Sequence, residues 1–87
     1  MFKVKIKKKI LKNVTKIPIN VQQRFWELIQ DLRVDGPHQI NWPNFSKLGK
    51  NEYHCHLIHH WVFCWRYEKD SIIIEVYYAG SRKKAPY

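Results

Sequence analysis

The start of the chain alternates between hydrophobic and polar residues with a period of two. Phe2, Val4 and Ile6 alternate with lysines. Because successive side chains of a strand point to opposite faces, this pattern predicts a strand with one buried and one solvated face. The apolar residues within 8–16 stand instead at helical spacing among further lysines, which indicates a short basic helix.

A stripe of apolar residues with the helical period predicts the main helix over residues 21–32. The stripe consists of Val21, Phe25, Leu28, Ile29 and Leu32. Pro18 suits the first turn of this helix, with Asn20 as the competing cap. The helix should end at Gly36 and Pro37, because glycine accepts a positive φ and proline cannot continue a helix.

The second half of the chain is typical of three consecutive strands that follow a loop. Residues 38–51 are rich in turn-forming residues, which predicts a loop. Segments 52–58 and 61–67 alternate in hydrophobicity, and 71–79 is rich in β-branched and aromatic residues, as expected of a central strand. The histidine pair 59–60 would form the hairpin between the first two strands.

The predicted order is therefore β-α-α-β-β-β, an α+β fold with two N-terminal helices packed on an antiparallel sheet. A chain of 87 residues is expected to form a single domain, residues 1–87. The helical stripe should cover the sheet face that carries Tyr53 and Cys55. The opposite face should then present His54, His56 and Cys64, so a disulfide between the two cysteines is not expected.

The charge of the chain points to polyanionic partners. Sixteen Lys and Arg against seven Asp and Glu give a net charge of +9. This favours a nucleic acid as the partner, with an acidic protein as the second candidate. A hydrophobic content of 45% argues against disorder. The absence of a long apolar run predicts a cytoplasmic protein without a membrane segment or signal peptide.

Together with the element order, several sequence features resemble the RelE/ParE toxin superfamily, with closest likeness to its RelE/HigB-like mRNA interferase branch. The features are Pro18, Val21 and Gln22 at the start of a helix, Lys47–Gly49, Tyr53–Leu57, the aromatic strand after it, and a Gly-x-Arg tail that ends in tyrosine. The resemblance implies the toxin of a type II toxin–antitoxin pair, held in check by an acidic antitoxin. It implies either metal-independent cleavage of mRNA in the ribosomal 30S A site, which inhibits translation, or poisoning of DNA gyrase.

The resemblance also implies which residues form the catalytic site. The basic positions on the open face of the second strand in the predicted order, residues 52–58, match His54 and His56. The arginine after the last strand matches Arg82, and the C-terminal tyrosine matches Tyr87. In one respect the chain departs from the pattern, because Val62 stands where such toxins commonly carry an arginine.

Arg66 is the nearest arginine on the same strand face as Val62, although it would lie about 13 Å away at about 3.3 Å per residue. A non-catalytic basic binding module with the same fold therefore remains an alternative. Further candidates for RNA binding are the cations and the loop tryptophan: Lys47, Lys50, Arg66, Lys83, Lys84 and Trp42. By contrast, the strictly alternating aromatic residues of 61–67 are expected in the core.

The candidate residues have the side chains that RNA transesterification needs. Histidine serves as base or acid near neutrality because its ordinary pKa is about 6.5. His54 and His56 leave the same strand face about 6.6 Å apart at the backbone, and Arg82 offers a bidentate fork for phosphate. Tyr87 could stack on a base or donate its phenolic proton. A pair of histidines on a wet strand face can also be plain surface, so this alternative stays open.

Neither a metal nor a cofactor is expected. The histidines and cysteines between residues 54 and 64 form a suggestive cluster, but they lack the spaced pairs of a structural zinc site. The alternation also turns Cys55 away from His54 and His56, so these three side chains should not share one ion.

Overall fold

The structure is a computed structural model that describes residues 1–58 and 60–87. Its elements are β1 (Lys3–Ile6), α1 (Lys8–Val14), α2 (Ile19–Asp35), β2 (Ser46–Gly49), β3 (Glu52–His56), β4 (Trp61–Tyr67), β5 (Ile73–Ser81) and a 3-10 turn, η1 (Arg82–Lys84). The predicted α+β class is confirmed, with the helices early in the chain and the antiparallel strands late. The hairpin prediction for His59 lies outside the described residues.

The strands form one sheet in the order β1-β5-β4-β3-β2, with β5 between two neighbours as predicted. Two details differ from the prediction. The sheet is mixed, because β1 pairs parallel to β5 whereas the other pairings are antiparallel. In addition, the segment predicted as loop contains β2, a short edge strand that pairs with β3. Three of the four residues of β2 are exposed, so its side chains carry no alternating pattern that could reveal it.

Helix α2 extends the predicted segment by a turn or less at each end, and its whole apolar stripe is buried. Pro18 directly precedes the first helical residue, so the backbone enters the helix with φ already restricted. Asn20 is not the cap, because it lies inside the helix and is exposed. The helix ends at Gly36, whose φ of 91° confirms the predicted stop.

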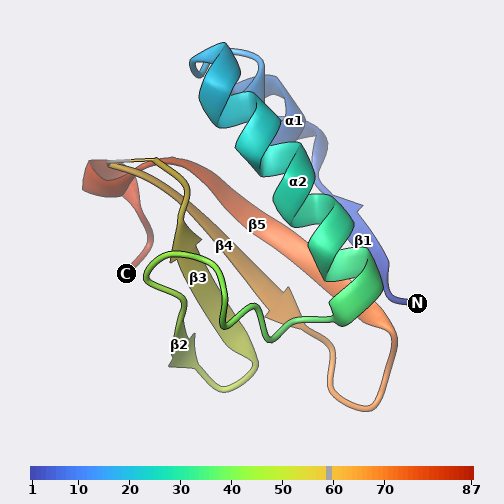
Figure 1. Cartoon of the computed structure of the whole chain (residues 1–87). Helices are drawn as coiled ribbons and strands as arrows, with labels where there is room; N and C mark the ends of the chain where they lie inside the picture. The colour runs from blue at the N-terminus through green and yellow to red at the C-terminus, as the bar shows by residue number, and fades with distance from the viewer. Residues whose placement is uncertain (59) are drawn as a thin grey trace.

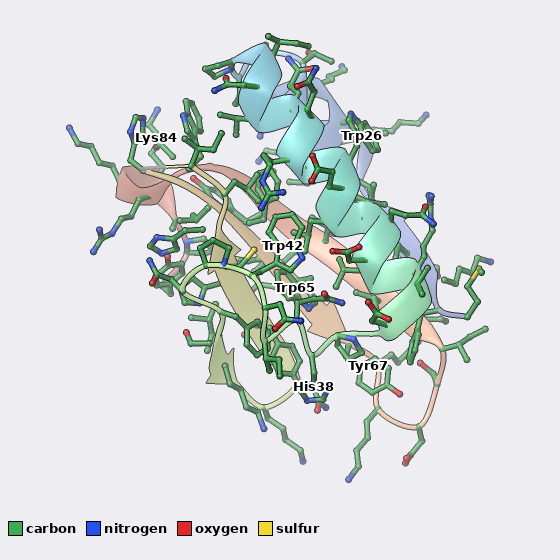
Figure 2. All side chains as sticks on the ribbon, viewed as in Figure 1. Trp26, His38, Trp42, Trp65, Tyr67 and Lys84 are labelled. Carbon is green, nitrogen blue, oxygen red and sulfur yellow. The ribbon has the colours of Figure 1, made fainter. Side chains whose placement is uncertain are left out.

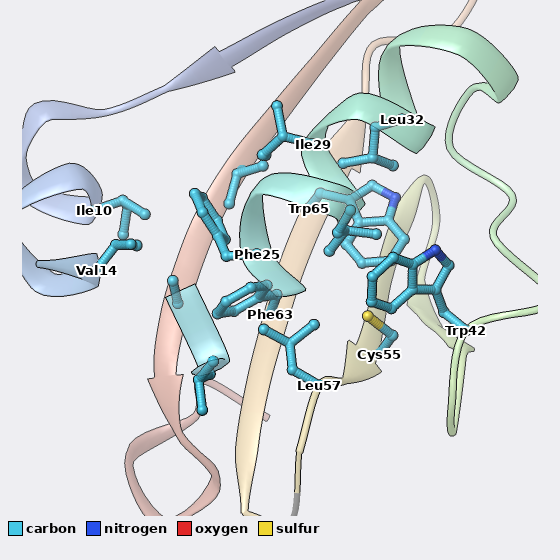
Figure 3. Packing of buried hydrophobic residues seen from close by; sticks show 14 of the residues in the cluster. Ile10, Val14, Phe25, Ile29, Leu32, Trp42, Cys55, Leu57, Phe63 and Trp65 are labelled. Carbon is cyan, nitrogen blue, oxygen red and sulfur yellow. The ribbon is translucent and has the colours of Figure 1, made fainter. Parts of the chain in front are cut away.

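The helices cover one face of the sheet (Figure 1), and the buried hydrophobic residues pack between them (Figure 3). The stripe of α2 packs on the predicted aromatic face of β4, and Phe25 meets Phe63 edge-to-face with ring centroids 4.5 Å apart (Figure 3). Trp65 is fully buried, and its indole Nε1 donates to the carbonyl of Pro37 at 3.0 Å. A buried indole needs such an acceptor, and this bond fixes the start of the loop that follows α2.

The opposite face of the sheet is less open than the alternation predicted. Val62 and Cys64 are fully buried there, and His54 is only 8% exposed. The chain covers this face with its own C-terminal segment, which turns back toward β3 after η1 (Figure 1). Both cysteines are free, as their opposite orientations predicted, and both are buried. No helix among the described residues is long and apolar enough to cross a bilayer.

Candidate active site

Two histidines of β3 form the centre of the candidate site. His54 and His56 leave the strand on the face away from the helices, while Cys55 between them belongs to the core. Their ring centroids lie 5.4 Å apart, so the imidazoles touch. The structure thus shows the two rings in direct contact, where the sequence predicted only that they share a face.

Each imidazole has its own polar partner from the segment before β3. Ser46 of β2 places its Oγ 2.9 Å from Nδ1 of His54. Asn44 places its amide nitrogen 3.1 Å from Nδ1 of His56. The backbone N–H of His56 also donates to the carbonyl of Pro43 at 2.9 Å, which ties this segment to β3. Sequence reasoning missed Asn44 and Ser46, since their segment showed only the composition of a loop.

The C-terminal segment adds an aromatic ring and a cation to the histidines. The ring of Tyr87 lies over His54 with centroids 4.7 Å apart and remains half exposed. Arg82 opens η1, and its backbone N–H donates to the carbonyl of His60 at 2.6 Å. This bond anchors the end of the sheet from which Arg82 acts electrostatically on His56 and Tyr87. The fold therefore gathers three of the four residues that the sequence proposed as catalytic, His54, His56 and Tyr87, and places Arg82 in η1 on the segment that leads to Tyr87.

Burial favours the uncharged forms of these groups. Burial lowers the pKa of His54, although a hydrogen bond to the Ser46 backbone partly opposes this effect. The pKa of His56 is lowered by burial first, and then by His54 and Arg82. Burial raises the pKa of Tyr87. At neutral pH the site is expected to hold neutral imidazoles and a protonated phenol beside the Arg82 cation.

Trp42 does not form the exposed aromatic platform that the sequence predicted. Its side chain is 7% exposed and lies between α2 and the following loop (Figure 2). Its Nε1 donates to a carboxylate oxygen of Asp31 at 2.9 Å, and the guanidinium of Arg24 lies 4.3 Å from the ring centroid. These contacts occupy its polar edge and one face of the ring, so Trp42 ties the loop to α2 and is not an exposed platform.

Arg66 does not lie where the arginine expected at position 62 would lie. Val62 lies opposite His56, whereas Arg66 lies opposite Glu52 at the far end of the β3–β4 pairing. Its guanidinium forms ion pairs with Glu52 at 3.6 Å and Glu75 at 3.3 Å, and it stacks on an aromatic ring. Arg66 is therefore paired with Glu52 and Glu75, at a distance from the histidines.

The remaining candidate cations differ in their position relative to the histidines. Lys47 pairs with Tyr53, whose side chain lies on the helix-covered side, so Lys47 points away from His54. Lys50 is exposed in the β2–β3 turn, at the end of β3 away from His56. Lys83 and Lys84 are exposed on η1, next to Arg82 (Figure 2). Within residues 1–58 and 60–87, no three His, Cys, Asp or Glu side chains gather as a metal-binding group.

Comparisons with known proteins identify the fold through structure and not through sequence. No family model matches the chain, and no curated protein matches it. The archaeal RelE–RelB complex from Pyrococcus horikoshii OT3 contains a similar chain, with a TM-score of 0.75 and 17% identity over 97% of this chain and 98% of that chain.

Two bacterial structures show the same similarity. The isolated E. coli RelE toxin gives a TM-score of 0.74 at 10% identity, covering 99% of this chain and 89% of that chain. The YoeB–YefM complex from Staphylococcus aureus gives a TM-score of 0.66 at 9% identity, covering 92% of this chain and 95% of that chain. At such low identities the similarity establishes the fold. The chain has the fold of these RelE and YoeB structures.

Proposed function

We propose that the chain is the toxin of a type II toxin–antitoxin pair and acts as a metal-independent endoribonuclease on mRNA, in the ribosomal A site. The fold supports the toxin role, since the similar structures are RelE and YoeB toxins. The observation that carries the catalytic part is the cluster of His54, His56, Arg82 and Tyr87. It joins two imidazoles and a phenol that lie in contact, and the cation of Arg82 lies on the segment that carries the phenol.

This cluster fits the cleavage of RNA by its own 2′-hydroxyl group. In that reaction the 2′-oxygen forms a bond to the adjacent phosphorus, and the bond from phosphorus to the 5′-oxygen breaks. A base takes the proton of the 2′-hydroxyl, and an acid, for which the phenol of Tyr87 is the candidate, gives a proton to the leaving 5′-oxygen. The products are a 2′,3′-cyclic phosphate and a 5′-hydroxyl end. Imidazoles suit the proton transfers because their pKa lies near neutrality.

Arg82 and Tyr87 supply the binding side of the reaction. A guanidinium pairs with phosphate oxygens through two parallel hydrogen bonds, and it stabilises the charge that develops in the transition state. Arg82 thus takes the electrostatic role for which the Val62 position offers no side chain. The half-exposed ring of Tyr87 can stack on an unpaired base, which is how proteins commonly hold single-stranded RNA.

We further propose that a cognate acidic antitoxin binds the chain. Two of the similar structures are complexes of a toxin with its partner, RelE with RelB and YoeB with YefM. The net charge of +9 would attract such an acidic partner and would also attract RNA.

The test is to map the 5′ ends of cellular RNA after brief expression in a bacterium. Wild type is compared with His56→Ala and with His60→Ala, a matched control at an exposed histidine of the same sheet end. We expect new mRNA ends with 5′-hydroxyl groups, in phase with codons. They should be lost in His56→Ala and kept in His60→Ala, and circular dichroism should show both variants folded.

Two other outcomes point to different functions. Growth arrest without new RNA ends would favour the gyrase-poisoning activity. Neither arrest nor new ends, from a folded protein, would leave the non-catalytic binding module as the better description.

A further inference from the structure

The hydrogen bond between Asn44 and His56 determines which nitrogen of the ring carries a proton. The amide nitrogen of Asn44 lies 3.1 Å from Nδ1 of His56. In this orientation the amide nitrogen faces the ring and donates, which gives Nδ1 the role of acceptor. In the neutral ring the single proton then sits on Nε2. The free edge of His56 is therefore a hydrogen-bond donor without a lone pair.

The surroundings of His56 keep this neutral form dominant. Burial lowers the pKa of His56 first, and the neighbouring imidazole of His54 and the positive charge of Arg82 lower it further. Tyr87, from the C-terminal segment, covers His54. On β4 the residue opposite His56 is Val62, which has no charge. A neutral imidazole with a lowered pKa can donate a hydrogen bond to a substrate while keeping its proton.

We propose that Asn44 is a positioning residue that fixes His56 as a neutral hydrogen-bond donor to the scissile phosphate, and not as the base of the reaction. This inference rests on the proposed ribonuclease function. In the reaction, Nε2–H of His56 donates to a phosphate oxygen and no proton leaves the ring. The proton of the 2′-hydroxyl passes to another base, and His54 is the adjacent imidazole.

The backbone holds Asn44 in place for this role. Its φ of 52° lies in the left-handed region, which asparagine adopts more readily than most residues. The preceding carbonyl, of Pro43, accepts the backbone N–H of His56 at 2.9 Å. Trp42, one residue earlier, is tied to Asp31 of α2. The amide thus reaches His56 from a segment anchored to both β3 and α2.

The decisive variant is Asn44→Asp, which keeps the size and the left-handed preference but turns the donor into an acceptor. A carboxylate at this place accepts from Nδ1–H, so the neutral ring loses its proton at Nε2, and the negative charge raises the pKa of His56. Asn51→Asp is the matched control, because Asn51 also has a positive φ, of 63°, but lies in the β2–β3 turn. It adds the same charge away from His56.

Nitrogen-15 NMR of the imidazoles reads the tautomer without any RNA. We expect protonated Nε2 in neutral His56 of the wild type and of Asn51→Asp. We expect protonated Nδ1 and a higher pKa in Asn44→Asp. A wild-type ring protonated on Nδ1 would overturn the inference while leaving the ribonuclease proposal intact.

The pH profile of RNA cleavage then separates a donor from a base. If His56 acts as a hydrogen-bond donor, then in Asn44→Asp its Nε2 carries a proton only while the ring is cationic. The cleavage rate of this variant should therefore fall at high pH. At about pH 8 we expect a loss of about ten-fold or more relative to Asn51→Asp, as for a hydrogen bond to a charged group. If His56 were the base, an aspartate on Nδ1 would support it, and the variant would match or exceed the wild type at this pH.

A second variant guards against a structural effect of the new charge. Asn44→Gly keeps the left-handed backbone but removes the amide, so both tautomers should coexist and the rate should fall by about two- to ten-fold. An unchanged rate in this variant would contradict the positioning role. Failure of the wild type to cleave RNA would instead remove the reaction itself, whatever tautomer the spectra show.

Discussion

At the scale of single residues, short-range partners decide what each side chain of the site can do. His54 and His56 are two positions apart on one strand, yet one ring meets a hydroxyl and the other meets an amide. Trp42 shows the same principle in the opposite direction. It stands in a loop beside a proline, but the carboxylate of Asp31 accepts its indole N–H and allows the ring to be buried.

The buried position of His54 predicts how stability changes with pH. Because burial lowers its pKa in the folded state, the unfolded chain binds more protons than the folded one between that value and about 6.5. The free energy of unfolding should therefore fall as the pH drops through this window. His56, whose pKa is lowered too, adds to the effect.

Urea unfolding between about pH 5 and 8 measures this dependence. His54→Gln, which does not titrate, should lose part of the slope, and His60→Gln serves as the matched control at an exposed histidine. Parallel slopes for wild type and His54→Gln would show that His54 is not the source.

At the scale of elements, backbone pairing forms a strand, β2, that the side-chain pattern did not predict. β2 is an edge strand with mostly exposed residues, so only its hydrogen bonds to β3 identify it. This strand nevertheless carries Ser46 to His54. η1 has a similar effect, because it turns the chain back so that Tyr87 reaches the same histidine. The site is thus assembled from β3, from the edge strand β2 that precedes it, and from the segment that follows β5.

The junction between α2 and the following loop depends on Gly36. Its φ of 91° and ψ of −166° lie in a region that only glycine enters readily. A Cβ at this position would also come within 2.8 Å of the ring of Phe2. Gly36→Ala should therefore lower the free energy of unfolding by about 1–3 kcal/mol.

Gly49→Ala in β2 is the control for this prediction, because its Cβ would meet only a glutamate oxygen at 3.9 Å. It should change stability by less than about 1 kcal/mol. Equal effects of the two substitutions, measured by denaturant unfolding, would refute the backbone argument for Gly36.

At the scale of the whole molecule, two segments of the chain concentrate positive charge. Lysines of β1 and α1 surround the N-terminus, and Arg82, Lys83 and Lys84 follow β5 near the histidines. If RNA passes over the candidate site, the second segment should contact its phosphates and the first should contribute less. Binding should also weaken with salt, because each phosphate contact releases counterions.

Replacing both Lys83 and Lys84 by Gln should make the plot of log affinity against log salt less steep by about 1.4, since each contact to a single strand contributes about 0.7. The matched control replaces Lys3 and Lys5 of β1, at the opposite edge of the sheet from β2. Fluorescence anisotropy with a short single-stranded RNA measures both. Equal changes for the two pairs would place the RNA elsewhere.

Much of the fold could be predicted from the sequence because buried residues recur along each element with the period of a helix or a strand. The stripe of α2, the alternation of β4 and the stop at Gly36 were all predicted, since each reflects which side of an element faces the core. The parallel pairing of β1 with β5 and the extra strand β2 were not, because strand pairing joins backbones and leaves little trace in side chains.

The sequence by itself determined the helices, the aromatic core and the common face of His54 and His56, because periods of 3.6 and two place side chains locally. Only the tertiary structure decided which residues surround that face. It brought Asn44 and Tyr87 to the histidines, buried Trp42 against α2 and neutralised Arg66 with Glu52 and Glu75. The physical reason is that these contacts join segments far apart in the chain, whose meeting depends on packing and backbone pairing and not on any local pattern.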